Sequence, residues 1–313
     1  MPKNNNLEPV KLPMKIKFGK KPKTAFKNNL ESIIVKLIDY PTIDRLRSYI
    51  PNFVGATWAE YPLEYYNEEE QNKYLQEMFD GLCLPGSRET IGLTFIISGI
   101  SMQEVTHILR HRMATFSADC SGDKWWSDKS GLVPYSIQNS PEFYSRYRDL
   151  VKECKQLYCD MIDSKDISIM DARYILPRCL ETFYFMRINL NDCISFINQR
   201  KDVQIQPETD NVIAYQMFYE LINVYGHFVT KMVDFSNPSP FYQKMARTGK
   251  ATNLYFPEAE VDNFEWNEND FIYQKKRREL NGTRHGRYNK FDEIQIKYFE
   301  FFKEHGVKVP DWV

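Results

Sequence analysis

The sequence predicts an α+β fold in which a mixed sheet packs against long helices. Two short segments, Ser32–Asp39 and Thr90–Ser98, are apolar and rich in β-branched residues, which is typical of strands. Three longer segments, 140–163, 171–200 and 208–233, show helical apolar spacing, and much of the circumference of the middle one is apolar, which indicates deep burial. A chain of 313 residues, 42% of them hydrophobic, is long enough to enclose such a core.

The N-terminal half begins with a polar segment. Residues 1–28 are rich in Lys, Asn and Pro, so we expect a tail that is either solvated or an arm for a partner. Helices are predicted at Pro41–Tyr49 and Glu68–Phe79. A further helix should begin at Ser101, because a Ser followed three residues later by Glu104 forms a capping box.

The C-terminal half begins with a long helix. Ser140 at its N-cap and Pro141 in its first turn predict the start, and the pattern runs to about Asp163. Beyond residue 233 the sequence mixes Pro, aromatic and charged residues. We therefore divide the chain into the tail, a main domain over 29–233 and a C-terminal extension over 234–313 that packs on it.

The composition limits the partners and the compartment. A net charge of -1 gives no basic field for nucleic acid or an anionic membrane. There is no apolar stretch of signal-peptide type and no run long enough to span a membrane, so we expect a cytoplasmic protein. None of the six cysteines forms a Cys-x-x-Cys pair, and no Glu follows His107 in the metalloprotease pattern, so no metal site is predicted.

The first motif that indicates a function is Arg110-His111-Arg112, which follows the helix that begins at Ser101. Cations at a helix C-terminus complement the helix dipole, so charge matching alone explains them. Three consecutive side chains that can carry positive charge, followed by a Ser/Gly-rich turn, also suit a phosphate or an anionic ring. The motif alone leaves both interpretations open.

Two further arginines lie in segments that are otherwise apolar. Arg173 and Arg200 are predicted in buried helices, where a guanidinium is costly unless an anion or hydrogen-bond acceptors satisfy it. A nucleotide phosphate and a pyrimidine carbonyl would do so. A structural pairing with Glu181 or Asp192 would do so as well.

Several motifs in one order give the sequence a family resemblance. Over about residues 33–225 it resembles the flavin-dependent thymidylate synthases, which carry Gly-Ile-Ser, Arg-His-Arg, a Ser-Gly turn, Ala-Arg-x-x-Leu-Pro and a helix with Asn before a Leu-Arg segment. The matching residues are Gly99-Ile100-Ser101, Arg110-His111-Arg112, Ser121-Gly122, Asp171-Ala172-Arg173-Tyr174-Ile175-Leu176-Pro177, Thr182, Asn189, Phe196, Arg200, Gln206 and Glu208.

The resemblance implies a fold, an assembly and a reaction. It implies a single-domain subunit of a homotetramer, with FAD at a subunit interface and active sites that borrow residues from neighbouring subunits. The implied reaction methylates dUMP at C5 to give dTMP, with methylenetetrahydrofolate as carbon donor and NADPH as reductant of the flavin. The flavin performs the redox chemistry, so no cysteine needs to attack the base.

The resemblance also implies roles for individual residues. Arg110, His111 and Arg200 are the implied catalytic residues. The implied flavin site comprises Glu89, Arg110, His111, Arg112, Asn189 and Gln204. The implied substrate site comprises His107, Asp119, Ser121, Gly122, Lys124, Arg173 and Arg200, with Ser121, Gly122 and Arg173 at the phosphate and Arg200 at the pyrimidine ring.

The sequence departs from the family pattern around this site. His107 replaces a Gln, Asn191 replaces an Arg and Gln204 replaces a His. The nucleotide loop is one residue longer than in the family, and Asp119 can stand in for the family's Glu. Asp123 lies where an Arg is expected near the phosphate, and Lys124 could restore the missing positive charge.

Three interpretations of these departures remain open. The chain is a divergent dUMP methylase, or it delivers a methyl or hydroxymethyl group to another pyrimidine nucleotide such as dCMP or UMP, or it is a non-catalytic relative that binds nucleotides.

Overall fold

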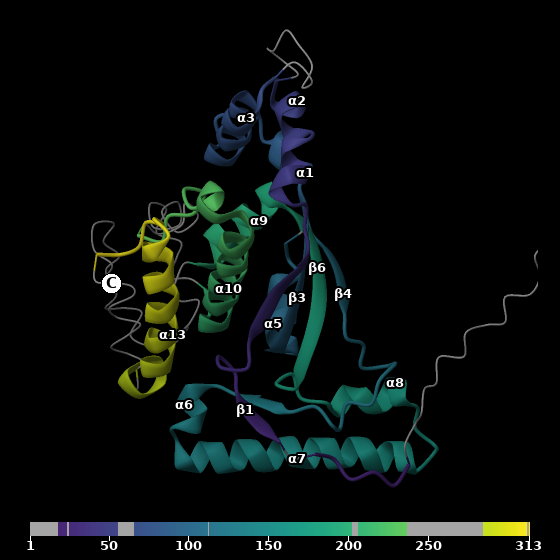
Figure 1. The fold of residues 1–313 in the computed structure, drawn as a ribbon. Helices are drawn as coiled ribbons and strands as arrows, with labels where there is room; N and C mark the ends of the chain where they lie inside the picture. Colours follow the sequence, from purple (N-terminus) through teal and green to yellow (C-terminus); the bar gives the residue numbers. More distant parts are fainter. Residues whose placement is uncertain are drawn as a thin grey trace, which may run out of the picture.

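An antiparallel sheet of four strands forms the centre of the molecule (Figure 1). The computed structural model describes residues 18–23, 25–55, 66–111, 113–201, 206–236, 284–311 and 313. The strand order is β2 (Ile34–Asp39), β3 (Gly92–Ser101), β6 (Glu181–Asn189) and β4 (Thr115–Ala118). A separate parallel pair joins β1 (Phe26–Asn28) to β5 (Gly131–Val133). The α+β class is confirmed, but the antiparallel and parallel pairings of the described residues lie in two sheets and not in one mixed sheet.

The prediction of a helix throughout 171–200 is wrong. The segment contains a short helix α8 (Ile169–Ala172), a 3-10 turn (Arg173–Ile175), strand β6 and only then helix α9 (Leu190–Arg200). Within β6, Thr182, Tyr184, Met186 and Ile188 are buried and alternate with more accessible residues. This period of two is that of a strand, and the long ladder with β3 stabilises it.

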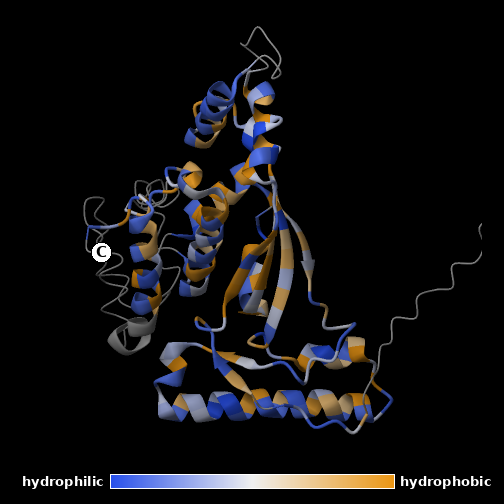
Figure 2. Cartoon of the chain, viewed as in Figure 1, coloured by the Kyte–Doolittle hydropathy of each residue, from blue (hydrophilic) through white to orange (hydrophobic). Residues whose placement is uncertain are grey.

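The main core lies between the sheet and the helices beside it. Leu93, Phe95 and Ile97 of β3 are fully buried. Helix α10 (Glu208–Tyr225) packs against β2, α9 and α13 (Arg284–Glu304). In Figure 2 the central strands carry long hydrophobic stretches, whereas helix α7 (Pro141–Asp163) alternates between hydrophobic and hydrophilic residues.

Helix α13 is attached to α10 by aromatic contacts. The ring of Phe299 lies 5.2 Å from that of Tyr215, and the ring of Phe302 lies 5.3 Å from that of Phe218. Aromatic pairs at this separation add to the stabilisation from area burial. Residues 237–283 of the proposed C-terminal extension lie outside the described residues.

A second, smaller core lies between α7 and the β1–β5 pair. Strand β1 belongs to this layer, so the boundary drawn at residue 28 falls at the end of a strand and not at the end of a tail; residues 1–17 lie outside the described residues. Helix α7 begins and ends where the sequence predicts, although the Ser140 side chain makes no capping hydrogen bond. Short helix α6 (Tyr135–Gln138) connects this layer to α7.

Helices α1 (Ile43–Arg47), α2 (Ile50–Gly55) and α3 (Glu68–Asp80) lie at the upper end of the sheet in Figure 1. Short helix α4 (Gly86–Glu89) precedes β3. The helices predicted at Pro41–Tyr49 and Glu68–Phe79 are confirmed, within a few residues, as α1 and α3. A 3-10 turn, η3 (Gly226–Val229), follows α10. No helix among the described residues is long and apolar enough to cross a membrane.

The Gly-Ile-Ser motif connects β3 to helix α5 (Met102–Ile108). Gly99 has φ +69° at a bulge in β3, and its carbonyl accepts a hydrogen bond of 2.6 Å from Ser32 Oγ. The predicted capping box is confirmed, since both the Ser101 and the Glu104 side chains accept from the opposite backbone N–H. Burial raises the pKa of the Glu104 carboxyl. This junction fixes the start of the helix that carries His107.

Candidate functional site

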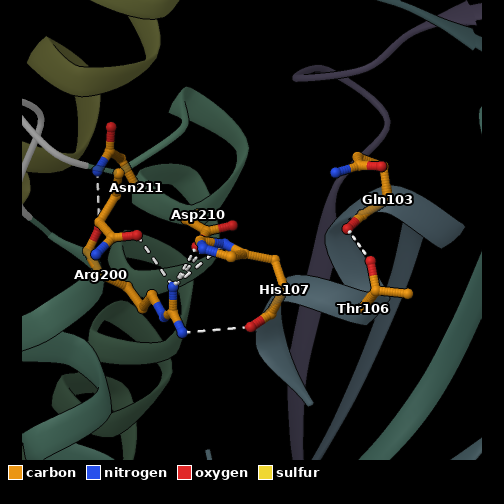
Figure 3. A network of polar contacts seen from close by, with 7 residues as sticks. Gln103, Thr106, His107, Arg200, Asp210 and Asn211 are labelled. Carbon is orange, nitrogen blue, oxygen red and sulfur yellow. Dashed lines mark hydrogen bonds and ion pairs between the residues drawn. The ribbon is translucent and has the colours of Figure 1, made fainter. Parts of the chain in front are cut away.

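A buried polar network joins α5, α9 and the start of α10 (Figure 3). Arg200 Nη1 lies 2.9 Å from Asp210 Oδ2 and 3.0 Å from Gln206 Oε1, and His107 Nδ1 lies 2.7 Å from the same Asp210 oxygen. Asn211 Nδ2 donates to the Arg200 carbonyl at 2.7 Å. The guanidinium therefore has a structural anion within the chain.

The anion that pairs with Arg200 is not either of the two predicted. Glu181 pairs with Lys27 at 2.8 Å, and Asp192 accepts a hydrogen bond from Asn189 Nδ2 at 2.6 Å. Asp210 was not predicted as a site residue. The signal in the sequence is an acid in the first turn of a helix whose later residues are mostly apolar, because a charge buried there requires a partner.

The Arg-His-Arg motif follows the end of α5. Arg110 is exposed, and Arg112 lies outside the described residues. The His111 ring meets Phe196 of α9 edge to face at 5.4 Å. Burial and, to a smaller extent, the Arg200 charge lower the pKa of His111, partly opposed by Asp192. The buried Nε2 atom of His111 has no hydrogen-bond partner among the described residues.

The structure brings together the Ser-Gly turn and the arginine of the Ala-Arg-x-x-Leu-Pro motif. A Cβ atom placed on Gly122 would lie 3.1 Å from Arg173 Nη1 and 2.5 Å from Met170 Sδ. Arg173 Nε donates to the Met170 carbonyl at 3.1 Å, which aims the guanidinium at the turn. The backbone of Ser121–Gly122 and the Arg173 side chain therefore form one cradle, and a larger residue at position 122 would displace the Met170 and Arg173 side chains.

Two lysines share one buried carboxylate beside this cradle. Asp119 has a fully buried side chain, Lys124 Nζ lies 2.9 Å from its Oδ1 atom, and Lys129 bonds its Oδ2 atom. Lys124 also lies 4.9 Å above the Phe183 ring. The ion pair with Asp119 thus fixes the position of Lys124. The two lysines and the one carboxylate together carry one excess positive charge, which can attract an anion. Lys129 was not predicted, although it is the next lysine in the loop.

The remaining predicted residues do not gather at these places. Glu89 is exposed at the end of α4. The Asn189 side chain caps α9, accepting from the Asp192 N–H at 2.8 Å. Gln204 lies outside the described residues. Trp126 is buried in the second core, and the Trp125 ring lies 5.5 Å from that of Tyr158, so both tryptophans pack within the protein.

Comparison with known proteins identifies the family of this arrangement. The model of the family described as thymidylate synthase complementing protein matches residues 47–225, more than half of the chain. The chain belongs to the flavin-dependent thymidylate synthase family. The matched range contains α5, the nucleotide loop, β6, α9 and α10, which carry the network and the cradle.

Relatives within the flavin-dependent thymidylate synthase family are distant in sequence. The enzyme of that name from Thermococcus onnurineus is 28% identical over 198 residues, covering 61% of this chain and 79% of its own. The one from Pyrococcus furiosus is 26% identical over 168 residues, covering 52% and 68%. A solved structure of the UMP/dUMP methylase PolB from Streptomyces cacaoi superposes with a TM-score of 0.53 at 14% identity, covering 64% of this chain and 93% of that one, which shows a shared fold.

The two groups of family residues lie apart within one chain. His107 contacts Arg200 of α9 and His111 contacts Phe196 of α9, whereas Gly122 lies close to Arg173, which directly follows α8. No hydrogen bond or ion pair among the described residues joins the two groups.

Proposed function

We propose that this protein is a flavin-dependent methyltransferase that converts dUMP to dTMP. It would use FAD as cofactor, methylenetetrahydrofolate as carbon donor and NADPH as reductant. The observation that carries the proposal is the close approach of Gly122 to Arg173, because a residue without a side chain faces a guanidinium whose two terminal nitrogens make no hydrogen bond within the described chain. Backbone amides and a guanidinium together suit a nucleotide phosphate.

The charges around the cradle favour a phosphate over a neutral ligand. The two positive charges of Lys124 and Lys129 exceed the single negative charge of Asp119. Arg173, which lies close to Gly122, adds another cation. Asp123 is exposed, so its carboxylate can be solvated away from the anion. The arrangement supports a dianionic monophosphate at this end of the sheet.

The residues at the end of α5 fit the flavin. The buried Nε2 atom of His111 lacks a partner, and the exposed Arg110 guanidinium can reach an anionic ring or phosphate. The lowered pKa of His111 keeps the imidazole neutral near pH 7, so its free nitrogen can serve as donor or acceptor to the ring. When bound, FAD supplies the hydride that completes the methyl group.

The cysteines fit a route without a thiolate nucleophile. Burial raises the pKa of the thiols of Cys154, Cys159, Cys179 and Cys193, which keeps them protonated at neutral pH. A thiol that stays protonated is a poor nucleophile toward the pyrimidine ring. This supports transfer of the carbon without a covalent bond between a cysteine and the base.

We also propose that the active protein is a homotetramer. Phe143, Leu150 and Leu157 are exposed at seven-residue spacing and form a stripe along α7. A second α7, antiparallel and centred on Leu150, would place Phe143 of one copy opposite Leu157 of the other. It would also bring Arg146 near Glu153 of the partner subunit. The self-complementary charge supports a second copy of this chain as the occupant.

Two measurements test the function. The purified protein should show flavin absorption near about 450 nm, a general property of bound oxidised flavin. It should convert dUMP to a product heavier by one CH2 group when methylenetetrahydrofolate and NADPH are both present, and not when either is omitted. Parallel reactions with UMP and dCMP determine the base and sugar preference, and an additional oxygen in the product would identify hydroxymethyl transfer. A protein that retains neither flavin nor a pyrimidine nucleotide contradicts the proposal.

The assembly is tested by light scattering. The wild-type protein should be a tetramer, and Leu150→Glu should reduce its size, whereas the exposed substitution Lys152→Glu, on another face of α7, should not. A wild-type monomer that binds FAD with full occupancy would refute the shared site.

A further inference from the structure

The segment before β1 is bound to both α7 and the nucleotide loop. Residues 18–23, which we call the N-terminal strap, run along α7 in Figure 1. The side chain of Asp163, the last residue of α7, accepts a hydrogen bond of 2.8 Å from a backbone N–H of the strap. The Lys23 N–H donates to the Ser127 carbonyl at 3.2 Å. The strap therefore connects α7 to the end of the nucleotide loop, residues 119–130 between β4 and β5.

A buried lysine of α7 binds both segments. Lys155 is 2% exposed, and its ammonium donates to the Lys129 carbonyl at 2.8 Å and also to the Lys23 carbonyl. Burial lowers the pKa of Lys155, and the charge of Asp128 partly opposes this. A buried ammonium is costly unless acceptors replace its water, so the two carbonyl groups are held where their oxygens meet Nζ. Lys155 thus fixes the strap and the end of the loop to one helix.

The loop carbonyl that Lys155 binds belongs to a member of the charged cluster. The Lys129 side chain pairs with the buried Asp119 carboxylate, which also pairs with Lys124 at 2.9 Å. With both lysines in place, the cluster carries one excess positive charge. If Lys129 moved away, Asp119 would neutralise Lys124 and this excess would be lost. The backbone position of Lys129 therefore determines how strongly the cluster attracts an anion.

We propose that Lys155 is a positioning residue for the nucleotide phosphate, because by holding the Lys129 backbone it keeps a net positive charge beside the cradle of Gly122 and Arg173. This inference rests on the proposed function, in which the cradle binds that phosphate. Lys155 directs its ammonium at backbone carbonyls and acts on the ligand only through the loop. The strap that it also binds precedes the range 47–225 matched by the family model, so this support comes from a segment outside that range.

The test compares dUMP with deoxyuridine, which lacks only the phosphate. Calorimetry on the flavin-loaded protein gives a Kd for each, and the ratio of the two measures what the phosphate contributes. Lys155→Met removes the ammonium and keeps an apolar side chain of similar length. We expect it to weaken dUMP binding about tenfold and to leave deoxyuridine binding and flavin content unchanged. Lys152→Met removes a lysine that pairs with Asp149 on the surface of α7; it is the matched control and should bind both ligands as wild type does.

Two further comparisons separate positioning from a general loss of stability. In the Lys129→Met background, Lys155→Met should cause no further loss of dUMP affinity, because it acts through Lys129. Tyr147→Phe removes another hydrogen bond of α7, from Tyr147 Oη to the Leu132 carbonyl at 2.7 Å, and should lower the melting temperature without changing the ratio. The inference is overturned if Tyr147→Phe lowers the ratio as much as Lys155→Met does. A further loss of about tenfold in the Lys129→Met background also overturns it.

A milder variant keeps the test decisive if circular dichroism shows that Lys155→Met is not folded. Lys20→Met removes the ion pair between the strap and Asp128, whose side chains are both partly exposed. It should lower the ratio about threefold, and an unchanged ratio would then overturn the inference.

The outcomes also separate this inference from the function on which it rests. A wild-type protein that binds dUMP more tightly than deoxyuridine, with the same ratio in folded Lys155→Met, overturns the role of Lys155 alone. A wild-type protein that binds no pyrimidine nucleotide overturns both.

Discussion

Gly99→Ala tests whether the Gly-Ile-Ser motif is a requirement of the backbone. The residue has φ +69°, where an L side chain is strained, at a cost of about 1–2 kcal/mol. A Cβ would also lie 1.7 Å from the carbonyl oxygen of Ser32, and this separation must grow to at least 3.0 Å. Because the neighbour is backbone, the chain before β2 has to move away from β3.

The expected loss of stability follows from these contributions. Moving the chain breaks the hydrogen bond from Ser32 Oγ to the Gly99 carbonyl, worth about 1 kcal/mol, and imposes an overpacking strain of about 1–3 kcal/mol. Together with the conformational cost, the free energy of unfolding should fall by about 3–6 kcal/mol. This is a large part of the roughly 5–15 kcal/mol that stabilises a typical domain.

Gly81→Ala is the matched control. Its φ is +77°, but the nearest atoms to a Cβ are the ends of the Arg88 side chain at 3.8 Å, so only the conformational cost applies. Urea unfolding followed by circular dichroism should place Gly99→Ala at least about 2 kcal/mol below Gly81→Ala. Equal losses in the two variants would refute the close approach as the reason for glycine.

Three further predictions concern the site and the helix that carries it. Gly122→Ala should weaken dUMP binding at least about tenfold with little loss of fold stability, because the new methyl group displaces the Met170 and Arg173 side chains. Unchanged affinity in calorimetry would show that the cradle does not bind the phosphate. Glu104→Ala should lower the free energy of unfolding by about 1 kcal/mol, whereas Glu104→Gln, which keeps the cap and removes a charge whose burial raises the pKa of that carboxyl, should cost less; the order is checked by thermal unfolding. His111 has a lowered pKa, so the unfolded chain binds its proton first and stability should fall as pH drops through about 6.5 and below. His111→Asn should reduce this slope, and a slope identical to that of the wild type would mean that another group causes it.

The sequence determined the elements whose signals are local. The capping box of Ser101 and Glu104, the limits of α7, and the strand at Ile34–Asp39 follow from patterns within a few residues. The order of motifs also determined the family, because each motif needs its residue types at fixed spacing. These are properties that neighbouring residues impose on each other.

The tertiary structure decided what depends on a distant partner. Glu181–Asn189 is a strand because β3 and β4 pair with it on its two edges, and an apolar segment alone does not distinguish a buried strand from a buried helix. Arg200 takes Asp210 as its anion because α9 and α10 pack against each other and bring the two together. The contact of Gly122 with Arg173 likewise joins two segments whose proximity no local pattern encodes. The sequence therefore determines which residue types the site contains. Packing determines which charged side chains pair with each other, and so which of them face a ligand.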